Sequence, residues 1–262
     1  MKLIYRISTP LKLALALSGI VLITLSNSSF ALAIQPQAID SAKQALEKFK
    51  RGDLQGAIAD YTQAIQISPD FINAYIERGI AYHDAGDLSR AIADLDRAIQ
   101  IDPNNALALY NRGEIYSDLN KLPQALSDLN QALELKPGYA EAYNNRGVVY
   151  AKLGKFETAL KDIGRAIALK PNYVFAYNNR ALVRTGLKDF EGAIADYTEA
   201  IRLAPTLAEA YLNRGKLHLA TGNRQAALTD WQQAAKLFQE RGDRDRYQQV
   251  QNALKQLQQA TE

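Results

Sequence analysis

Residues 72–105 read INAYIERGIAYHDAGDLSRAIADLDRAIQIDPNN, and the same pattern returns along the chain at one fixed step, that from Pro69 to Pro103. One proline, one arginine and one alanine mark the step: Pro69, Pro103, Pro137, Pro171 and Pro205; Arg78, Arg112, Arg146, Arg180 and Arg214; Ala57, Ala91, Ala125, Ala159, Ala193 and Ala227. A fixed period of this length is typical of a stacked repeat array, in which each unit buries its apolar face against its neighbours. The period therefore predicts the fold class.

Each repeat is predicted to contain two amphipathic helices. In the quoted repeat, residues 73–85 and 88–100 each place apolar or small side chains on one helical stripe. Gly86 ends the first helix, because glycine accepts the left-handed conformation of a C-terminal cap. Pro103 ends the repeat, because the residue before a proline is biased out of the helical region. Aligned on the proline, the blocks are 38–71, 72–105, 106–139, 140–173, 174–207 and 208–241.

The spacing inside each block resembles that of the tetratricopeptide repeat. In the quoted block the matching pattern is Tyr75-x-x-Arg78-Gly79-x-x-Tyr82, then Ala91-x-x-x-Leu95-x-x-Ala98, then Pro103. The resemblance covers residues 38–241 and implies an all-α, right-handed superhelical solenoid of six repeats. In such solenoids the first helices line a concave groove.

The ends of the array depart from the pattern, as expected of repeats with one face in solvent. The first block lacks the arginine, and the sixth has Gln239 in place of the proline. Within residues 242–262, the apolar side chains Tyr247, Val250, Leu254 and Leu257 recur at helical spacing. This segment is predicted to be a C-terminal capping helix, with a partner-binding arm as the alternative.

Residues 1–33 do not follow the repeat. They combine a basic start, an apolar run over residues 13–25 and the small-residue sequence Ala31-Leu32-Ala33. This order predicts a secretory signal peptide cut after Ala33. The apolar run is shorter than the roughly 20 residues that cross a bilayer, and an uncleaved membrane anchor is the alternative. We therefore expect export, to the periplasm or, because Arg-Gly repeats of this kind resemble those abundant in cyanobacteria, to the thylakoid lumen.

The net positive charge of the chain comes from its first 33 residues. Three of the 31 Lys and Arg and none of the 28 Asp and Glu lie in residues 1–33, which leaves 28 of each in the mature chain. A neutral chain lacks the basic footprint of a nucleic-acid-binding protein, so no nucleic-acid partner is expected. The mature form is not expected to bind a membrane. Without cysteine, packing alone holds the fold.

The repeats also carry a ladder of opposite charges. Each second helix has an aspartate, at Asp60, Asp94, Asp128, Asp162, Asp196 and Asp230. Because arginine offers a planar fork to a carboxylate, we expect each aspartate to bind the arginine of the next repeat, as Asp60 would bind Arg78. The alternative is a pair within one repeat, such as Arg78 with Asp94, which leaves Asp60 over. Either pairing is structural rather than catalytic.

A second ladder consists of asparagines, each directly before the arginine of the first helix. Such a residue lies roughly 100° round the helix from the arginine, and we expect it to lie off the packing seam and in the groove. Asparagine both donates and accepts hydrogen bonds, as a peptide main chain requires. The ladder resembles that of the O-linked N-acetylglucosamine transferase repeats, where such residues hold extended peptides. The alternative is that these asparagines are merely solvated. The expected peptide-binding residues are Asn111, Asn145, Asn179 and Asn213, with Tyr110, Asn144, Asn178, Phe175 and Lys216 beside them.

No catalytic or metal-binding pattern is found. The chain has no phosphate-binding or nucleophile-turn motif, and its two histidines, His83 and His218, lie too far apart to build a zinc site. The lysines and arginine with which chaperone-type members clamp an acidic C-terminal tail are also missing. We therefore expect a non-enzymatic scaffold without cofactors that binds a protein or peptide in the groove. The alternative is an architectural or assembly-factor subunit that uses its convex face or end caps. The sequence does not predict an oligomeric state.

Overall fold

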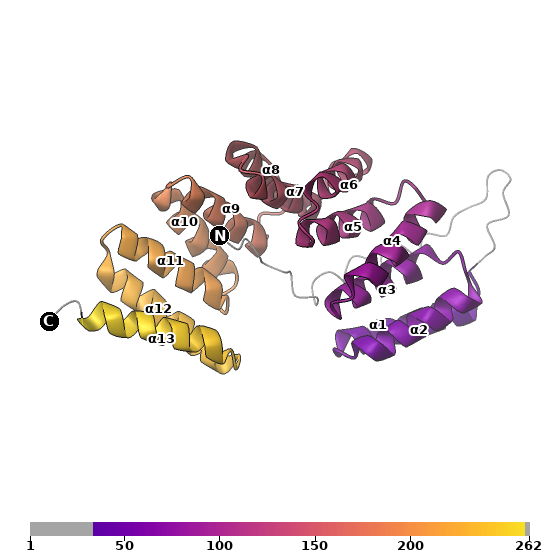
Figure 1. Cartoon of the computed structure of the whole chain (residues 1–262), viewed down its shortest axis with the longest axis horizontal. Helices are drawn as coiled ribbons and strands as arrows, with labels where there is room; N and C mark the ends of the chain where they lie inside the picture. Colours follow the sequence, from indigo (N-terminus) through magenta and orange to yellow (C-terminus); the bar gives the residue numbers. More distant parts are fainter. Residues whose placement is uncertain (1–33, 260–262) are drawn as a thin grey trace. The chain divides into compact units, whose positions relative to one another are not determined.

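The computed structural model describes residues 34–259, and this part of the chain folds into thirteen helices with no strand (Figure 1). The helices are α1 (Pro36–Lys50), α2 (Leu54–Ile67), α3 (Ile72–Asp84), α4 (Leu88–Ile101), α5 (Ala106–Asp118), α6 (Leu122–Leu135), α7 (Ala140–Lys152), α8 (Phe156–Leu169), α9 (Val174–Gly186), α10 (Phe190–Leu203), α11 (Ala208–Ala220), α12 (Arg224–Glu240) and α13 (Arg244–Gln259). The expected signal peptide, residues 1–33, lies outside the described residues.

Consecutive helices pack on one another. The first helix of a repeat packs on the second, as α3 does on α4, and the second packs on the first helix of the next repeat, as α4 does on α5. The final helix, α13, packs on α12 and buries Val250, Leu254 and Leu257. The prediction of an all-α repeat fold is confirmed.

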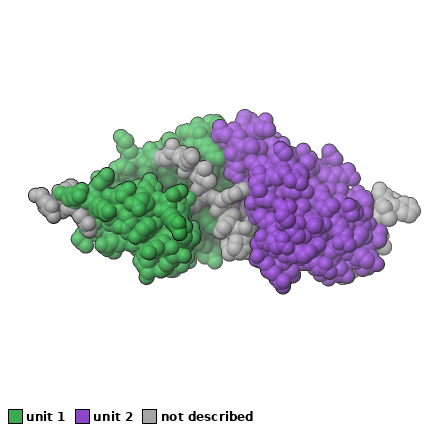
Figure 2. Space-filling view, turned by 60° about the horizontal axis from the view of Figure 1, so that its bottom comes forward, with its two compact units in different colours: residues 1–5, 143–262 green, residues 6–142 purple. Residues whose placement is uncertain are grey.

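The chain divides into two compact units, coloured in Figure 2. Of the described residues, unit 2 holds residues 34–142 and unit 1 holds residues 143–259. The boundary falls inside α7, between Ala142 and Tyr143.

The turn between the two helices of a repeat needs a left-handed residue. Gly86 has φ +84°, as expected of a glycine that caps a helix. In two repeats a residue with a side chain takes the same place, Asn120 with φ 57° and Lys188 with φ 64°. Asparagine tolerates this region, whereas lysine has no local hydrogen bond to offset the steric cost.

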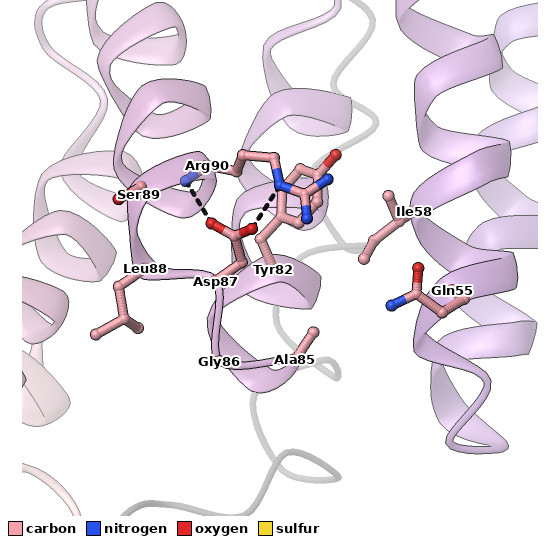
Figure 3. A pocket seen from close by; sticks show the side chains of 9 residues that line it. All are labelled: Gln55, Ile58, Tyr82, Ala85, Gly86, Asp87, Leu88, Ser89 and Arg90. Carbon is pink, nitrogen blue, oxygen red and sulfur yellow. Dashed lines mark hydrogen bonds and ion pairs between the residues drawn. The ribbon is translucent and has the colours of Figure 1, made fainter.

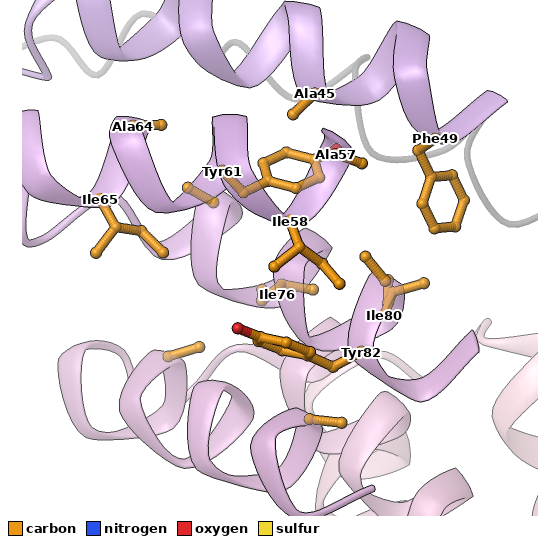
Figure 4. Packing of buried hydrophobic residues seen from close by; sticks show 14 of the residues in the cluster. Ala45, Phe49, Ala57, Ile58, Tyr61, Ala64, Ile65, Ile76, Ile80 and Tyr82 are labelled. Atoms are coloured by element: carbon orange, nitrogen blue, oxygen red, sulfur yellow. The ribbon is translucent and has the colours of Figure 1, made fainter. Parts of the chain in front are cut away.

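Small residues let the two helices of a repeat approach closely. At Gly147, an added Cβ would lie 2.6 Å from Ile163 Cγ1 and 3.1 Å from the carbonyl oxygen of Ala159. In unit 2, the alanines Ala45, Ala57 and Ala64 are likewise fully buried among larger side chains that include Tyr61 (Figure 4). The core is therefore a seam of alternating small and large side chains along the helix pairs.

The expected pairing of arginines and aspartates between repeats was wrong, and the alternative within one repeat is what the structure shows. Each pair is bidentate, with Nε and Nη2 donating to the two carboxylate oxygens: Arg78–Asp94, Arg112–Asp128, Arg146–Asp162, Arg180–Asp196 and Arg214–Asp230. The close packing of first on second helix places the two side chains face to face. Asp60 is left over, and Lys48 Nζ binds it at 2.7 Å.

The guanidinium still links repeats, through its third nitrogen. Nη1 of Arg78 donates to Thr62 Oγ1 at 2.9 Å, and Nη1 of Arg112 donates to Asp96 Oδ1 at 2.7 Å. Both acceptors belong to the preceding repeat, so one side chain holds its own repeat together and ties it to its neighbour.

Candidate protein-interaction surface

Four asparagines on α7 and α9 of unit 1 form what we call the asparagine cluster: Asn144, Asn145, Asn178 and Asn179. Asn179 Nδ2 donates to Asn144 Oδ1 at 3.0 Å, and Asn144 Nδ2 donates to Asn145 Oδ1 at 3.1 Å. The cluster therefore joins the first helices of two successive repeats through side-chain amides.

Asn178 is the exception within the cluster. Its side chain is only 1% exposed, yet neither its Oδ1 nor its Nδ2 has a hydrogen-bond partner among the described residues. An unpaired buried amide costs about 1–3 kcal/mol. Asn178 therefore presents an unused donor and an unused acceptor at the same point.

The asparagines lie deeper than the sequence suggested. Asn144 and Asn179 are buried, and Asn145 and Asn213 are half-buried. The hydrogen bond between Asn179 and Asn144 shows that these two side chains meet between the first helices of successive repeats and do not point into solvent.

The equivalent residues of unit 2 make different side-chain contacts. Asn111 is buried, and its Nδ2 donates to the carbonyl oxygen of Leu107 one turn earlier at 2.8 Å. Tyr110 is buried too, and its ring lies 4.8 Å from that of Tyr139. The donor of Asn111 is thus already used inside its own helix.

Glu77 takes the place of the asparagine on α3. It is half-buried, and no cation among the described residues pairs with it. Burial raises the pKa of its carboxyl group from the ordinary 4.5 to about 7. Burial also raises the pKa of Tyr139, with further contributions from the nearby Glu141 and Glu114. The carboxyl group of Glu77 is therefore partly protonated near neutral pH.

Two further expected residues lie on the first helices α9 and α11 of unit 1. Phe175 is half-buried on α9, with its ring edge-on to Tyr173 at 6.3 Å. Lys216 is exposed on α11 and forms no ion pair with any described residue. The surrounding protein nevertheless lowers the pKa of its ammonium group, because desolvation disfavours the charged form.

A charged cluster at the C-terminal end of the array was not predicted from the sequence. Glu209 on α11 is buried and accepts hydrogen bonds from Arg241, at 3.0 Å, and from Arg246. These arginines flank the turn into α13, and both lie over the ring of Phe238. The cluster fixes the last helix to the array. Its only sequence signal is a pair of arginines beside the expected cap.

A shallow pocket of about 540 Å³ lies in unit 2, at the turn between α3 and α4 (Figure 3). Arg90 stacks over the ring of Tyr82 at 4.5 Å, and its Nε donates to Asp87 Oδ2 at 2.6 Å. The charged side chains of this pocket, Asp87 and Arg90, are thus paired with each other.

The described residues include no group of His, Cys, Asp or Glu side chains able to hold a metal ion. Within residues 34–259, no helix has the length and apolar character of a membrane span.

Comparison with known proteins gives consistent matches. A sequence profile described as "TPR repeat" matches residues 45–86, 81–119, 113–154 and 183–222, and one described as "Tetratricopeptide repeat" matches residues 140–173. No curated protein sequence matches the chain.

Solved structures of similar fold come from several proteins. A chain of the APC/C hetero-tetramer Cut9-Hcn1 matches with a TM-score of 0.76 and 16% identity, over 84% of this chain and 43% of that one. PilW, a type IV pilus biogenesis factor, matches with a TM-score of 0.73 and 23% identity, over 82% and 99%. MamA matches with a TM-score of 0.53 and 26% identity, over 63% and 96%. At these identities the first two likenesses show the fold alone, and this chain spans less than half of the first.

Proposed function

The chain belongs to the tetratricopeptide repeat family, and on that premise we propose that it is a non-enzymatic scaffold that binds an extended protein segment on the first-helix surface of unit 1. Proteins of this family in general mediate protein–protein interactions. The observation that carries the proposal for this chain is the buried and unpaired amide of Asn178 beside the bonded members of the asparagine cluster.

A peptide main chain offers the hydrogen-bond partners that the side chain of Asn178 lacks. One peptide group supplies a carbonyl oxygen for Nδ2 and an N–H for Oδ1, so a single residue of an extended segment satisfies both atoms. The neighbouring amides of Asn144 and Asn179 are already oriented by their mutual hydrogen bond, which reduces the entropy lost on binding.

Asn178 is buried, so the segment reaches it only when neighbouring side chains move, such as that of Phe175, which is half-buried one turn earlier on α9. Changing the rotamer of such side chains is fast compared with binding. In this proposal, the first helices of unit 1 present a polar strip bordered by an aromatic ring.

The test uses the full chain and a library of random dodecapeptides. Peptides selected on the wild type are synthesised, and their dissociation constants are measured by fluorescence anisotropy. In the triple variant Asn145→Ala, Asn179→Ala, Asn213→Ala we expect a loss of about 0.5–1.5 kcal/mol per hydrogen bond, more than tenfold in affinity. The control variant Gln232→Ala, Gln239→Ala removes exposed amides from the second helix α12 and should bind as the wild type does.

Asn178→Leu separates binding from folding. Replacing an unpaired buried amide by an apolar side chain of similar volume should leave the melting temperature unchanged or raise it. If the amide serves the ligand, peptide affinity should still fall. Unchanged affinity in both folded variants would contradict binding at this surface and favour an architectural subunit that contacts its partner through the convex face or the ends.

The place of action rests on residues 1–33. We infer that the protein works in an exported compartment, the periplasm or the thylakoid lumen, after cleavage behind Ala33. Amino-terminal sequencing of the native protein tests this, and a chain that still begins at Met1 would indicate a membrane-anchored form.

A further inference from the structure

Two polar groups of unit 1 could form hydrogen bonds or ion pairs that the fold does not supply. One is the amide of Asn178 on α9, and the other is the ammonium group of Lys216 on α11. Neither has a hydrogen-bonding or ion-pair partner among the described residues. The other basic side chains of α9 and α11 differ, because Arg180, Arg184 and Arg214 are each held by an aspartate.

The repeat relates these two groups to each other. Asn179 follows Asn144 by 35 positions and bonds to it, and Asn213 follows Asn178 by the same step. Asn213 therefore holds the place relative to Asn178 that Asn179 holds relative to Asn144, but no hydrogen bond joins Asn213 to Asn178. Lys216 lies three residues after Asn213 on the same helix, a spacing that places two side chains on one face.

The partial desolvation of Lys216 gives the second argument. Lys216 is exposed, yet the protein beside it partly desolvates its ammonium group and lowers its pKa, and a carboxylate bound there would stabilise the charged form. On α11 the one carboxylate is Glu209, and Arg241 and Arg246 already hold it. The counter-charge for Lys216 is thus missing from its own helix.

We propose that α9 and α11 form a subsite that selects an acidic side chain in the bound segment, with Asn178 and Asn213 on the peptide group and Lys216 on the carboxylate. This rests on the proposed function and adds the partner class, an extended segment that carries aspartate or glutamate. The carboxylate is that of a side chain within the segment rather than that of a chain end, because a segment that passes Asn178 continues in both directions along the first-helix surface.

The experiment compares the full-length wild type with Lys216→Gln and Lys216→Glu in the same dodecapeptide selection. The wild type should enrich aspartate or glutamate at one position of the peptides, and Lys216→Glu should enrich lysine or arginine there. Lys161→Glu makes the same charge change at an exposed site on the second helix α8 and is the matched control. It should keep the acidic preference of the wild type.

Synthetic peptides then isolate the pair. Changing the selected glutamate to glutamine should weaken binding to the wild type about tenfold, as expected of one charge-assisted contact, and should change binding to Lys216→Gln less than twofold. The difference in affinity of the wild type for the glutamate and the glutamine peptide should decrease as the salt concentration is raised. Amidating the peptide C-terminus should leave the dissociation constant unchanged.

The outcomes separate the two proposals. An equal loss in the wild type and in Lys216→Gln, or selected peptides without acidic residues, would overturn the acidic subsite while leaving peptide binding intact. A loss on amidation would show that the bound carboxylate is the chain end, which also overturns it. Failure to select any peptide that depends on the asparagine cluster would count against the proposed function itself.

Discussion

Arg146 binds Asp162, in the same repeat, with Nε and Nη2 donating to the two carboxylate oxygens at 2.6 and 2.8 Å. Asp162 is 7% exposed, so removing the arginine leaves a buried carboxylate without its counter-charge. We expect Arg146→Ala to lower the free energy of unfolding by about 1–3 kcal/mol. Urea unfolding followed by circular dichroism measures it.

A double-mutant cycle checks the pairing. Arg146→Ala combined with Asp162→Ala should cost less than the sum of the single changes, whereas the exposed pair of Arg202 and Glu199 should show almost no coupling. Strict additivity of Arg146→Ala and Asp162→Ala would mean that the bidentate pair does not form in solution.

Gly147 and Gly164, in the same repeat, should respond in opposite directions to alanine. A Cβ at Gly147 meets Ile163 Cγ1 at 2.6 Å, whereas one at Gly164 meets nothing within 4 Å. Gly147→Ala should therefore destabilise by about 1–3 kcal/mol through overpacking, and Gly164→Ala should stabilise by about 1 kcal/mol through helix propensity. Thermal and urea unfolding measure both, and equal effects would contradict the close helix approach at Gly147.

Gly164→Thr should add a link between repeats. Position 164 corresponds to Thr62, whose hydroxyl accepts from Arg78 Nη1, and glycine leaves the matching Nη1 of Arg180 without that acceptor. Threonine should bind Arg180, and valine of the same shape cannot. We expect Gly164→Thr to exceed Gly164→Val in unfolding free energy by about 0.5–1.5 kcal/mol. The difference should vanish in an Arg180→Ala background.

Glu77 should make stability depend on pH. Its folded-state pKa of about 7 lies above the ordinary 4.5, so the folded protein binds the proton more tightly than the unfolded chain. This contribution is fully present below about pH 4.5 and is lost as the pH rises through about 7. Glu77→Gln should remove that loss, and its advantage over wild type should grow from pH 5 to pH 8 to the order of 1–3 kcal/mol. A wild-type profile parallel to that of Glu77→Gln would refute the raised pKa.

The helices could be predicted from residues that act locally. Gly86 and Pro103 end helices through their own backbone preferences, and the structure places α3 and α4 within one residue of the predicted starts and ends. The constant period of the sequence likewise predicted the repeat fold, because every repeat packs against neighbours of the same sequence pattern.

The side-chain pairings needed the tertiary structure. Each arginine has one aspartate before it, in the preceding repeat, and another after it, in its own repeat, at similar separations along the chain. A strictly periodic sequence makes the two choices equivalent. The close packing of α3 on α4 selects Asp94 for Arg78, a contact between side chains that propensity does not encode.

The asparagines show the same division. Their period could be seen in the sequence, but the bond between Asn144 and Asn179, the bond of Asn111 to its own helix and the unpaired amide of Asn178 could not. Equivalent positions differ because each environment depends on the side chains of the next repeat. The sequence by itself determined the helices and their order. The tertiary structure decided which polar groups are used up by the fold and which remain for a partner, because burial and hydrogen bonding are set by neighbours distant in the chain.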